Sequence, residues 1–441
     1  MQDMEAEMQT RVRAGGRNED RTTGNMVWGE FVHTTARPVR GVADPHLHAH
    51  CFTFNATYDG DEARWKAGQF GDLKRDARYF EAMFHSRLAG SVAELGYGIE
   101  RTAKGWEVAG IEHDLREKFS QRTNQIERLA QERGLTGEAK AQLGALTREA
   151  KTQGVTWGEL RNSWQARMTF DEWRAVERVV HEQPAARAKT FTPDEAIGYA
   201  VEHSFERASA VAEREISGRA LRLTVGTSSV EAIQAAIDRS DLIRREIDGR
   251  ALVTSPKVLE EEREMLAFAR GGRGQEPPLG RADAKLDPAL SAEQRAAVEH
   301  VLTSNDRVIA IRGGAGTGKT TLMREAVREI REGGHEVYLF APTAEASRGV
   351  LRAEGFHDAD TVAHFLKDPM LQEELRGKIV WIDEAGLLGT RSLAHAFRIA
   401  QEKNLRLILS GDSHQHAAVE RGDALRLLEA RAGVRAAELT E

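Results

Sequence analysis

The sequence is poor in the features that mark secreted and membrane proteins. Its 441 residues include a single cysteine, Cys51, so no disulfide can form within the chain. Such cysteine usage is typical of a reducing cytoplasm. No run approaches the roughly 18 apolar residues of a membrane helix, and the first five residues, MQDME, are acidic rather than signal-like. We therefore expect a cytoplasmic protein with no membrane segment.

An excess of positive charge is also missing. The formal net charge is −7, so the chain has no overall basic surface for nucleic acid, and any such contact must come from local patches. With 40% hydrophobic residues the composition is that of a globular protein, and this length suggests about three domains. The local basic groups are Arg11 with Arg13, Arg17 and Arg21, Lys74 with Arg75 and Arg78, and Arg270 with Arg273.

Histidines, by contrast, are concentrated near the N-terminus. Four of the fifteen fall between positions 33 and 50, three of them at alternate positions. Side chains two residues apart in a strand share one face. A strand over residues 47–54 would therefore place His48 and His50 side by side, with His46 just beyond.

A neighbouring strand over residues 26–33 would add His33 to this group. Three neutral imidazoles with open coordination positions suit a divalent metal that acts as a Lewis acid on a phosphate or carbonyl oxygen. The alternative is that these histidines are strand-face residues hydrogen-bonded to the backbone. Cys51 would point to the opposite face from His50, and we expect it to be a small core residue.

A phosphate-binding loop lies far from the histidines. The apolar strand 307–311 leads into a glycine-rich turn and then a helical stretch over 321–332, which is the context of a true P-loop. Backbone N–H groups and the helix N-terminus would bind phosphates, Lys319 would reach the β- and γ-phosphates of ATP, and Thr320 would bind Mg²⁺. The expected nucleotide-binding residues here are Gly313, Gly314, Ala315, Gly316, Thr317, Gly318, Lys319, Thr320 and Thr321.

Three further segments agree with a nucleotide site. The apolar strand 379–382 ends in Asp383, placed to bind a magnesium-bound water, and Glu384, placed to polarise the attacking water. A later strand opens into a turn where Gln415 could sense the γ-phosphate. Upstream, Gln294 precedes a helix and could read the adenine edge, although an ordinary surface glutamine is the alternative.

The remaining pattern gives a coarse map of the chain. Residues 65–95 are expected to be helical, 97–111 to form a hairpin around Lys104-Gly105, and 251–254 to form a strand. Residues 112–187 are expected to be helical with breaks at glycines, and their tryptophans to serve in helix packing. The glycines are Gly134, Gly144 and Gly154, and the tryptophans are Trp157, Trp164 and Trp173.

Together the two signatures resemble a MobF-class conjugative relaxase fused to a superfamily 1 helicase, the TrwC/TraI-like family. The resemblance rests on Thr23-Gly24-Asn25, on the segments around His33 and His46–His50, on Arg64–Lys66 and on the P-loop. It implies that His33, His48 and His50 are the metal ligands, with His46 a possible substitute. It covers most of the chain and is weakest between about 110 and 280.

The resemblance also implies an architecture and an activity. The fold is expected to be α/β and multidomain, with an α+β relaxase-type, HUH palm-like remnant and a C-terminal RecA-like domain with a parallel sheet. The activity is nicking and strand transfer at an origin of transfer, coupled to ATP-dependent unwinding. Expected partners are single-stranded origin DNA, relaxosome proteins and type IV secretion coupling proteins. The expected domains are 1–115 (relaxase), 116–275 (mainly helical), 276–290 (linker) and 291–441 (RecA-like).

Two parts of that machinery are not expected in this chain. In the family the nucleophilic tyrosines precede the first triad histidine by a longer segment than is present before His33, and no tyrosine here is assigned their role. A second RecA-like domain would have to follow Gln415, where little sequence remains. Whether the chain is an enzyme is therefore left open, with weak ATP binding and little turnover expected.

Two other functions stay open on the sequence alone. One is a RecD-like, DNA-dependent ATPase whose N-terminal part only docks DNA. The other is a non-catalytic DNA-binding remnant of a mobile element. The sequence does not give the origin sequence, the metal identity, the oligomeric state or the length of the chain made in the cell.

Overall fold

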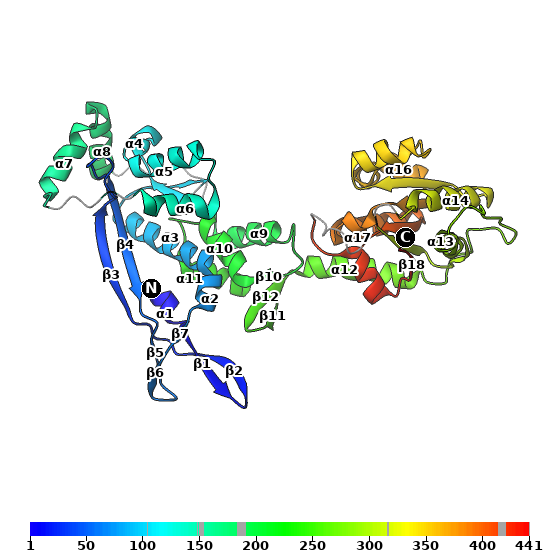
Figure 1. The fold of residues 1–441 in the computed structure, drawn as a ribbon, viewed down its shortest axis with the longest axis horizontal. Helices are drawn as coiled ribbons and strands as arrows, with labels where there is room; N and C mark the ends of the chain where they lie inside the picture. The colour runs from blue at the N-terminus through cyan, green and yellow to red at the C-terminus, as the bar shows by residue number, and fades with distance from the viewer. Residues whose placement is uncertain are drawn as a thin grey trace. The chain divides into compact units, whose positions relative to one another are not determined.

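In a computed structural model the chain divides into two compact units (Figure 1), each described here by itself. Unit 1 contains Met1–Ala200 and Arg214–Ser240, and unit 2 contains Val201–Glu213 and Asp241–Glu441. The structure describes residues 1–103, 105–147, 149, 154–182, 191–314, 317–412 and 420–440. None of the helices within these ranges is long and apolar enough to cross a membrane.

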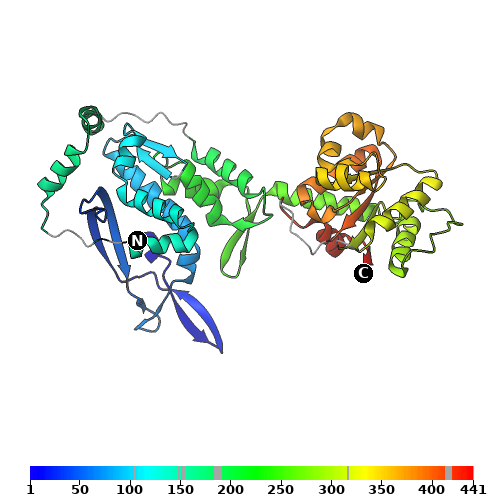
Figure 2. The same cartoon turned by 45° about the horizontal axis from the view of Figure 1, so that its top comes forward.

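Unit 1 builds its strands into small antiparallel groups. A long two-stranded ribbon pairs β3 (Trp28–Thr35) with β4 (Pro45–Thr53), and Figure 2 shows it as a twisted hairpin. Most of its residues on both faces are exposed. The other groups are β2 (Arg17–Thr22), β1 (Gln9–Ala14) and β7 (Gly68–Gln69) in that order, β5 (Thr57–Asp59) with β6 (Arg64–Lys66), and β8 (Ile99–Thr102) with β9 (Gly105–Val108).

The helices of unit 1 are mostly short. The longest is α3 (Ala77–Glu94), which buries Phe80 and Met83. The others are α1 (Gln2–Glu5), α2 (Gly71–Arg75), α4 (His113–Lys118), α5 (Gln121–Glu132), α6 (Gly137–Leu146), α7 (Trp157–Ala166), α8 (Phe170–Glu182), α9 (Pro193–Ser204, reaching into unit 2), α10 (Glu213–Leu223) and α11 (Val230–Arg239).

Two local predictions for unit 1 are wrong. The helix expected from Trp65 begins only at Gly71, because the residues from Arg64 pair as β6 with β5 instead. Gly144 does not break a helix but lies inside α6, where a Cβ would meet Ile126 at an ordinary van der Waals distance of 3.6 Å. The hairpin expected around Gly105 is confirmed by the pairing of β8 with β9.

Unit 2 contains a six-stranded parallel sheet, as expected for a RecA-like domain. Its strand order is β15-β14-β16-β17-β13-β18. The strands are β13 (Val308–Gly313), β14 (Val337–Ala341), β15 (Asp360–Thr361), β16 (Ile379–Ile382), β17 (Arg406–Gly411) and β18 (Ala436–Leu439). A separate antiparallel sheet joins β10 (Val211–Ala212), β12 (Arg250–Thr254, confirming the predicted strand) and β11 (Ile243–Ile247).

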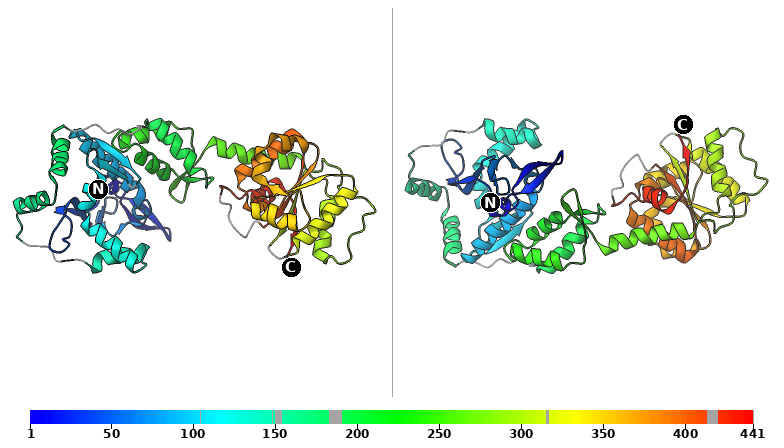
Figure 3. Two further views of the ribbon diagram at one scale, coloured as in Figure 1. Left: turned by 90° about the horizontal axis from the view of Figure 1, so that it is seen from above. Right: turned by 90° about the horizontal axis from the view of Figure 1, so that it is seen from below.

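Helices cover both faces of the parallel sheet (Figure 3). Because side chains alternate along a strand, Val380 and Ile382 face one core and Ile379 and Trp381 the other. The first core contains α12 (Pro256–Gly271), α15 (Val362–Lys367), α17 (Thr390–Lys403), α18 (Ala424–Leu427) and η3 (Leu428–Ala432); the second contains α13 (Ala292–Thr303), α14 (Lys319–Glu332) and η1 (Glu345–Leu351). Two short helices, α16 (Pro369–Glu374) and η2 (Ala385–Leu387), complete the unit.

Candidate nucleotide and metal sites

The ribbon β3–β4 brings three imidazoles together. His33 and His48 are directly paired across the ribbon, and His50 shares their face. The ring centres of the three residues lie 5.1 to 5.4 Å apart. Imidazoles that bind one tetrahedral metal through nitrogens at about 2.0–2.1 Å have ring centres about 5 Å apart. The spacing of these rings therefore fits a shared metal.

The ring nitrogens of these histidines do not yet point to one common position. Among the described residues, no group of three or more His, Cys, Asp or Glu side chains is arranged to hold a metal ion as it stands. The strand register brings the three rings to this spacing, and exposed side chains on a ribbon can change rotamer at small cost. Metal binding by these histidines stays a prediction.

His46 orients His48 within this cluster. Its carbonyl oxygen lies 2.9 Å from Nδ1 of His48, and because a carbonyl only accepts, Nδ1 carries the proton. That leaves Nε2 of His48 with a lone pair, the arrangement that metal-binding histidines show. The two rings stack with centres 4.5 Å apart, and burial, helped by His48, lowers the pKa of His46. The alternative of a histidine hydrogen-bonded to the backbone is thus confirmed for His48, while its role as a metal ligand stays a prediction.

Cys51 is not a core residue. The prediction placed its side chain opposite His50, but the thiol is exposed. The other face of the ribbon borders a cavity of about 970 Å³, lined by Ala49 and Cys51 on one side and by Phe80 and Phe84 of α3 on the other. The sequence pattern gives the face of a strand but not whether that face is covered.

The P-loop connects β13 to α14, as expected. Helix α14 begins at Lys319, whose Nζ donates to the carbonyl of Gly313 at 2.8 Å, and Thr317 Oγ1 donates to the carbonyl of Gly314 at 2.9 Å. Gly318 has φ +75°, a conformation that favours glycine. Two of the expected phosphate-binding residues, Ala315 and Gly316, lie outside the described residues.

Two glycines of the loop, Gly313 and Gly318, are closely packed. A Cβ on Gly318 would come within 2.3 Å of Nε2 of Gln294, and one on Gly313 within 2.9 Å of Oγ1 of Thr317. Lys319, Thr320 and the start of α14 thus meet at a closely packed turn with a helix N-terminus, which is the chemistry that a nucleotide phosphate requires. Thr321, by contrast, is exposed at the first turn of α14.

Gln294 contacts the P-loop rather than open solvent. Its Oε1 accepts from the N–H of Ser291 at 3.0 Å in a capping box that begins α13, and its Nε2 donates to the carbonyl of Gly318 at 3.3 Å. Gln294 is half-buried, and these two hydrogen bonds give it a structural role at the cap and the loop. Recognition of adenine by Gln294 stays a prediction, since its amide already hydrogen-bonds to the backbone of the helix cap and of the P-loop.

The acidic pair follows β16 at the same edge of the sheet as the P-loop. Asp383 accepts a hydrogen bond from Ser410 Oγ at 2.7 Å, and Glu384 has the left-handed backbone angle φ +53°. Burial raises the pKa of the Glu384 carboxyl, and the Asp383 charge adds to this, while Lys319 opposes it. Carboxyl ends of parallel strands form the ligand-binding edge of such sheets. Gln415 lies outside the described residues.

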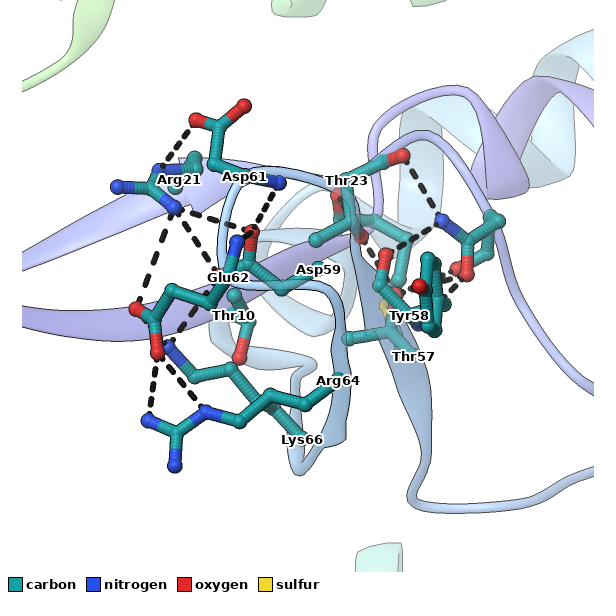
Figure 4. A network of polar contacts seen from close by, with 12 residues as sticks. Thr10, Arg21, Thr23, Thr57, Tyr58, Asp59, Asp61, Glu62, Arg64 and Lys66 are labelled. Carbon is teal, nitrogen blue, oxygen red and sulfur yellow. Dashed lines mark hydrogen bonds and ion pairs between the residues drawn. The ribbon is translucent and has the colours of Figure 1, made fainter.

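Several of the arginines in the candidate DNA-binding patches form ion pairs with acidic residues of unit 1. Arg11 pairs with Asp20, Arg75 with Asp72, and Arg21 with the buried Asp59. Figure 4 shows Asp59 at the centre of a network, where Nη1 of Arg21 donates at 3.0 Å, Nζ of Lys66 at 3.3 Å, and two backbone N–H groups also donate. The pairing of Arg21 with Asp59, 38 residues further along the chain, cannot be read from the sequence.

The tryptophans of the middle region line a cavity instead of packing in a core. Trp157 is 56% exposed, so it is not a core residue, although its ring meets that of Trp164 edge-on at 5.6 Å; Trp164 and Trp173 are half-buried. All three border a cavity of about 510 Å³ with Phe119 and Pro45. Because α7 and α8 are short and carry few buried residues, their aromatic side chains stay near the surface.

Comparison with known proteins matches the two ends of the chain to separate families. Residues 1–170 match the TrwC relaxase family, and residues 289–441 match an AAA domain family. The multifunctional conjugation protein TraI of Escherichia coli strain K12 is 31% identical over 223 residues, which cover 47% of this chain and 13% of that protein. A probable conjugal transfer protein TraA of Sinorhizobium fredii is 28% identical, over 41% of this chain and 19% of the relative.

Two further similarities concern a helicase and a solved structure. The ATP-dependent RecD2 DNA helicase of Deinococcus radiodurans is 28% identical over 46% of this chain and 29% of its own length. The metal-bound structure of the conjugative relaxase TrwC with oriT DNA is 34% identical over 38% of this chain and 57% of that one, with a TM-score of 0.35. The chain thus spans only a minor part of the curated relatives. It carries a region that matches the TrwC relaxase family and a region that matches an AAA domain family, and it is homologous to the conjugation protein TraI and the conjugal transfer protein TraA.

Proposed function

We propose that this chain is part of a conjugative relaxase-helicase, which nicks and transfers a DNA strand at an origin of transfer and couples this to ATP-dependent unwinding. The observation that carries the proposal is the presence on one chain of a P-loop facing an acidic pair and of three clustered imidazoles. The relatives are conjugation proteins, and the related TrwC was solved with oriT DNA.

In the motor half, each residue has a defined task. Lys319 would release Gly313 and bind the β- and γ-phosphates. Thr320 would bind the magnesium ion that neutralises phosphate charge, and Asp383 would hold that ion through a water bound to it. Glu384 would accept a proton from the attacking water, which requires its carboxyl to be ionised. Gln294 would hold the P-loop from the side through the Gly318 carbonyl, and Gln415 would sense the γ-phosphate.

In the relaxase half, the histidines would hold a divalent metal. His33, His48 and His50 would bind it, with His46 orienting His48 or serving as a substitute ligand. A metal bound there polarises the scissile phosphate of the DNA. Since none of the five tyrosines is assigned as the nucleophile, the attacking group stays outside this proposal.

The proposal extends to the domains, partners and compartment. We assign 1–115 to the relaxase part, 116–275 to a mainly helical connection, 276–290 to a linker and 291–441 to the motor. Single-stranded origin DNA, relaxosome proteins and a type IV secretion coupling protein are the proposed partners, and the cytoplasm is the proposed compartment.

Equilibrium binding of a fluorescent ATP analogue with magnesium tests the motor half. We expect the wild-type chain to bind, Lys319→Ala to lose binding, and single-stranded DNA to leave this difference in place. Lys367→Ala, which changes a lysine away from the P-loop, is the matched control and should bind like the wild type. A wild-type chain that binds no nucleotide would contradict the proposal.

A stand-alone RecD-like ATPase is the second candidate, favoured by the similarity to RecD2. Under that alternative the histidines have no role in DNA chemistry. Isothermal titration with Mn²⁺ and binding of a single-stranded origin oligonucleotide separate the two. If His48→Ala/His50→Ala loses Mn²⁺ binding and weakens origin binding, the relaxase proposal stands; if neither changes, the RecD-like function does.

A further inference from the structure

A buried chain of two hydrogen bonds leads to Asp383 from the neighbouring strand. Nε1 of Trp381 donates to Oγ of Ser410 at 2.8 Å, and Oγ of Ser410 donates to Oδ1 of Asp383 at 2.7 Å. Trp381 has no exposed surface and Ser410 is 1% exposed. None of the roles given above to the P-loop or the acidic pair uses Trp381 or Ser410.

The sheet register explains why these three side chains meet. Trp381 of β16 lies opposite Ile408 of β17, and both face the core beneath α13 and α14. Side chains alternate along a strand, so Asp383 and Ser410, each two residues further on, share that face. β17 lies between β16 and the P-loop strand β13, and Ser410 is paired with Ile311 on the other side. Ser410 thus sits between the P-loop strand and the acidic pair.

The chemistry of the three groups fixes the direction of both bonds. An indole N–H can only donate, so Ser410 must accept from Trp381. A serine hydroxyl has one proton to give, and the carboxylate of Asp383 can only accept it. With Trp381 occupying a lone pair of Ser410, the hydroxyl proton is directed at Oδ1. This bond restrains the orientation of the carboxylate and leaves Oδ2 for another ligand.

Two glycines hold the ends of β16 and β17 together at this point. A Cβ on Gly386 would come within 2.3 Å of the Asp412 carbonyl oxygen, and one on Gly411 within 2.9 Å of the backbone nitrogen of Gly386. The turn after Glu384 therefore packs directly on the end of β17. Little movement between Ser410 and Asp383 is possible without opening this contact.

We propose that Ser410, held by Trp381, is a positioning residue that orients the Asp383 carboxylate toward the magnesium ion of a bound nucleoside triphosphate. This rests on the proposed nucleotide-binding function and adds to it two residues outside the P-loop and the acidic pair. Groups that orient a metal ligand typically change metal affinity or activity by 10- to 100-fold when removed.

The test is binding of a fluorescent ATP analogue to the full chain, measured both with excess EDTA and over a magnesium titration. For Ser410→Ala we expect unchanged affinity in EDTA and an apparent magnesium constant weakened by about 10-fold or more. Ser304→Ala, which changes a serine just before β13, at the end of that strand opposite the P-loop, is the control and should match the wild type.

A second variant separates positioning from folding. Ser410→Ala leaves the buried indole N–H without its partner, whereas Trp381→Phe/Ser410→Ala removes both polar groups. We expect the double variant to recover thermal stability relative to Ser410→Ala while its magnesium constant stays weakened. Recovery of magnesium affinity together with stability would overturn the proposal, as would a Ser410→Ala magnesium constant equal to that of the wild type.

The same measurements test the positioning role of Ser410 separately from the proposed nucleotide-binding function. If the wild-type chain binds no nucleotide, the proposed function fails. If the wild type binds with magnesium and both variants do the same, only the role of Ser410 and Trp381 is refuted. The role of Ser410 is also refuted if Ser410→Ala loses affinity for the ATP analogue equally in EDTA and in magnesium, because the P-loop itself would then be disturbed.

Discussion

Glu384 combines a strained backbone with an unfavourable place for a charge. Its φ of +53° lies in the left-handed region, which costs a residue with a side chain roughly 1–2 kcal/mol. Burial and the neighbouring Asp383 also raise the pKa of its carboxyl. The left-handed backbone and the partly buried carboxyl both lower the stability of the fold. Such costs are typical of residues that take part in catalysis and not only in packing.

We expect Glu384→Gln to separate hydrolysis from binding. The amide keeps the size and hydrogen-bonding reach of the side chain but cannot accept a proton from water, so single-turnover hydrolysis should fall by about 10²- to 10⁴-fold. Binding of a fluorescent ATP analogue should stay near the wild-type value. Lys319→Ala, which should lose both, serves for comparison, and hydrolysis by Glu384→Gln at the wild-type rate would rule out its role as the base.

The sequence predicts well those helices and strands that are determined by residues close to one another in the chain. β4, β12, the β8–β9 hairpin and the P-loop strand follow from side-chain alternation and turn residues within a few positions. The predicted helix from Trp65 is wrong because the conformation of Trp65 depends on pairing with Tyr58 in another strand. For the same reason the contact of Ser410 with Asp383 does not follow from the sequence, although a serine near the end of an apolar strand is a signal for it.

The network around Asp59 ties β2 and β6 to the end of β5, and its charge gives a pH dependence. Burial opposes ionisation of Asp59, but hydrogen bonds from Arg21, a backbone N–H and Lys66 lower its pKa below 3.8. A lowered carboxyl pKa stabilises the fold above the unfolded-state value and loses that effect as the pH falls through the folded-state value. Stability from this network should therefore be complete at neutral pH and vanish in acid.

We expect Asp59→Asn to destabilise unit 1 at neutral pH and to differ less from the wild type as the pH drops below 3.8. Urea midpoints followed by circular dichroism across this range measure the difference. Asp61→Asn is the matched control, because Asp61 also pairs with Arg21 but its side chain is 75% exposed. A constant difference between Asp59→Asn and the wild type at every pH would contradict the charge mechanism.

At the scale of the whole chain, each expected ligand belongs to one unit. The imidazole cluster lies in unit 1, and the P-loop, the acidic pair and both cores of the parallel sheet lie in unit 2. A ligand that binds only the folded form stabilises the unit that holds its site. The proposed metal and the proposed nucleotide should therefore act on different parts of the unfolding curve.

Calorimetry of the full chain makes this measurable. We expect two unfolding transitions. A magnesium-ATP analogue should raise the midpoint temperature of one, and Mn²⁺ at the histidines should raise that of the other. A ligand at a concentration of 100 times its dissociation constant adds about 2.7 kcal/mol to the free energy of unfolding of the unit that binds it. Lys319→Ala should remove only the nucleotide shift, and His48→Ala/His50→Ala only the Mn²⁺ shift. Since each variant controls for the other, loss of both shifts in either one would show that the two sites are not independent. A single transition raised by both ligands would show instead that the units unfold together, and the chain would then couple its metal and nucleotide sites through its stability.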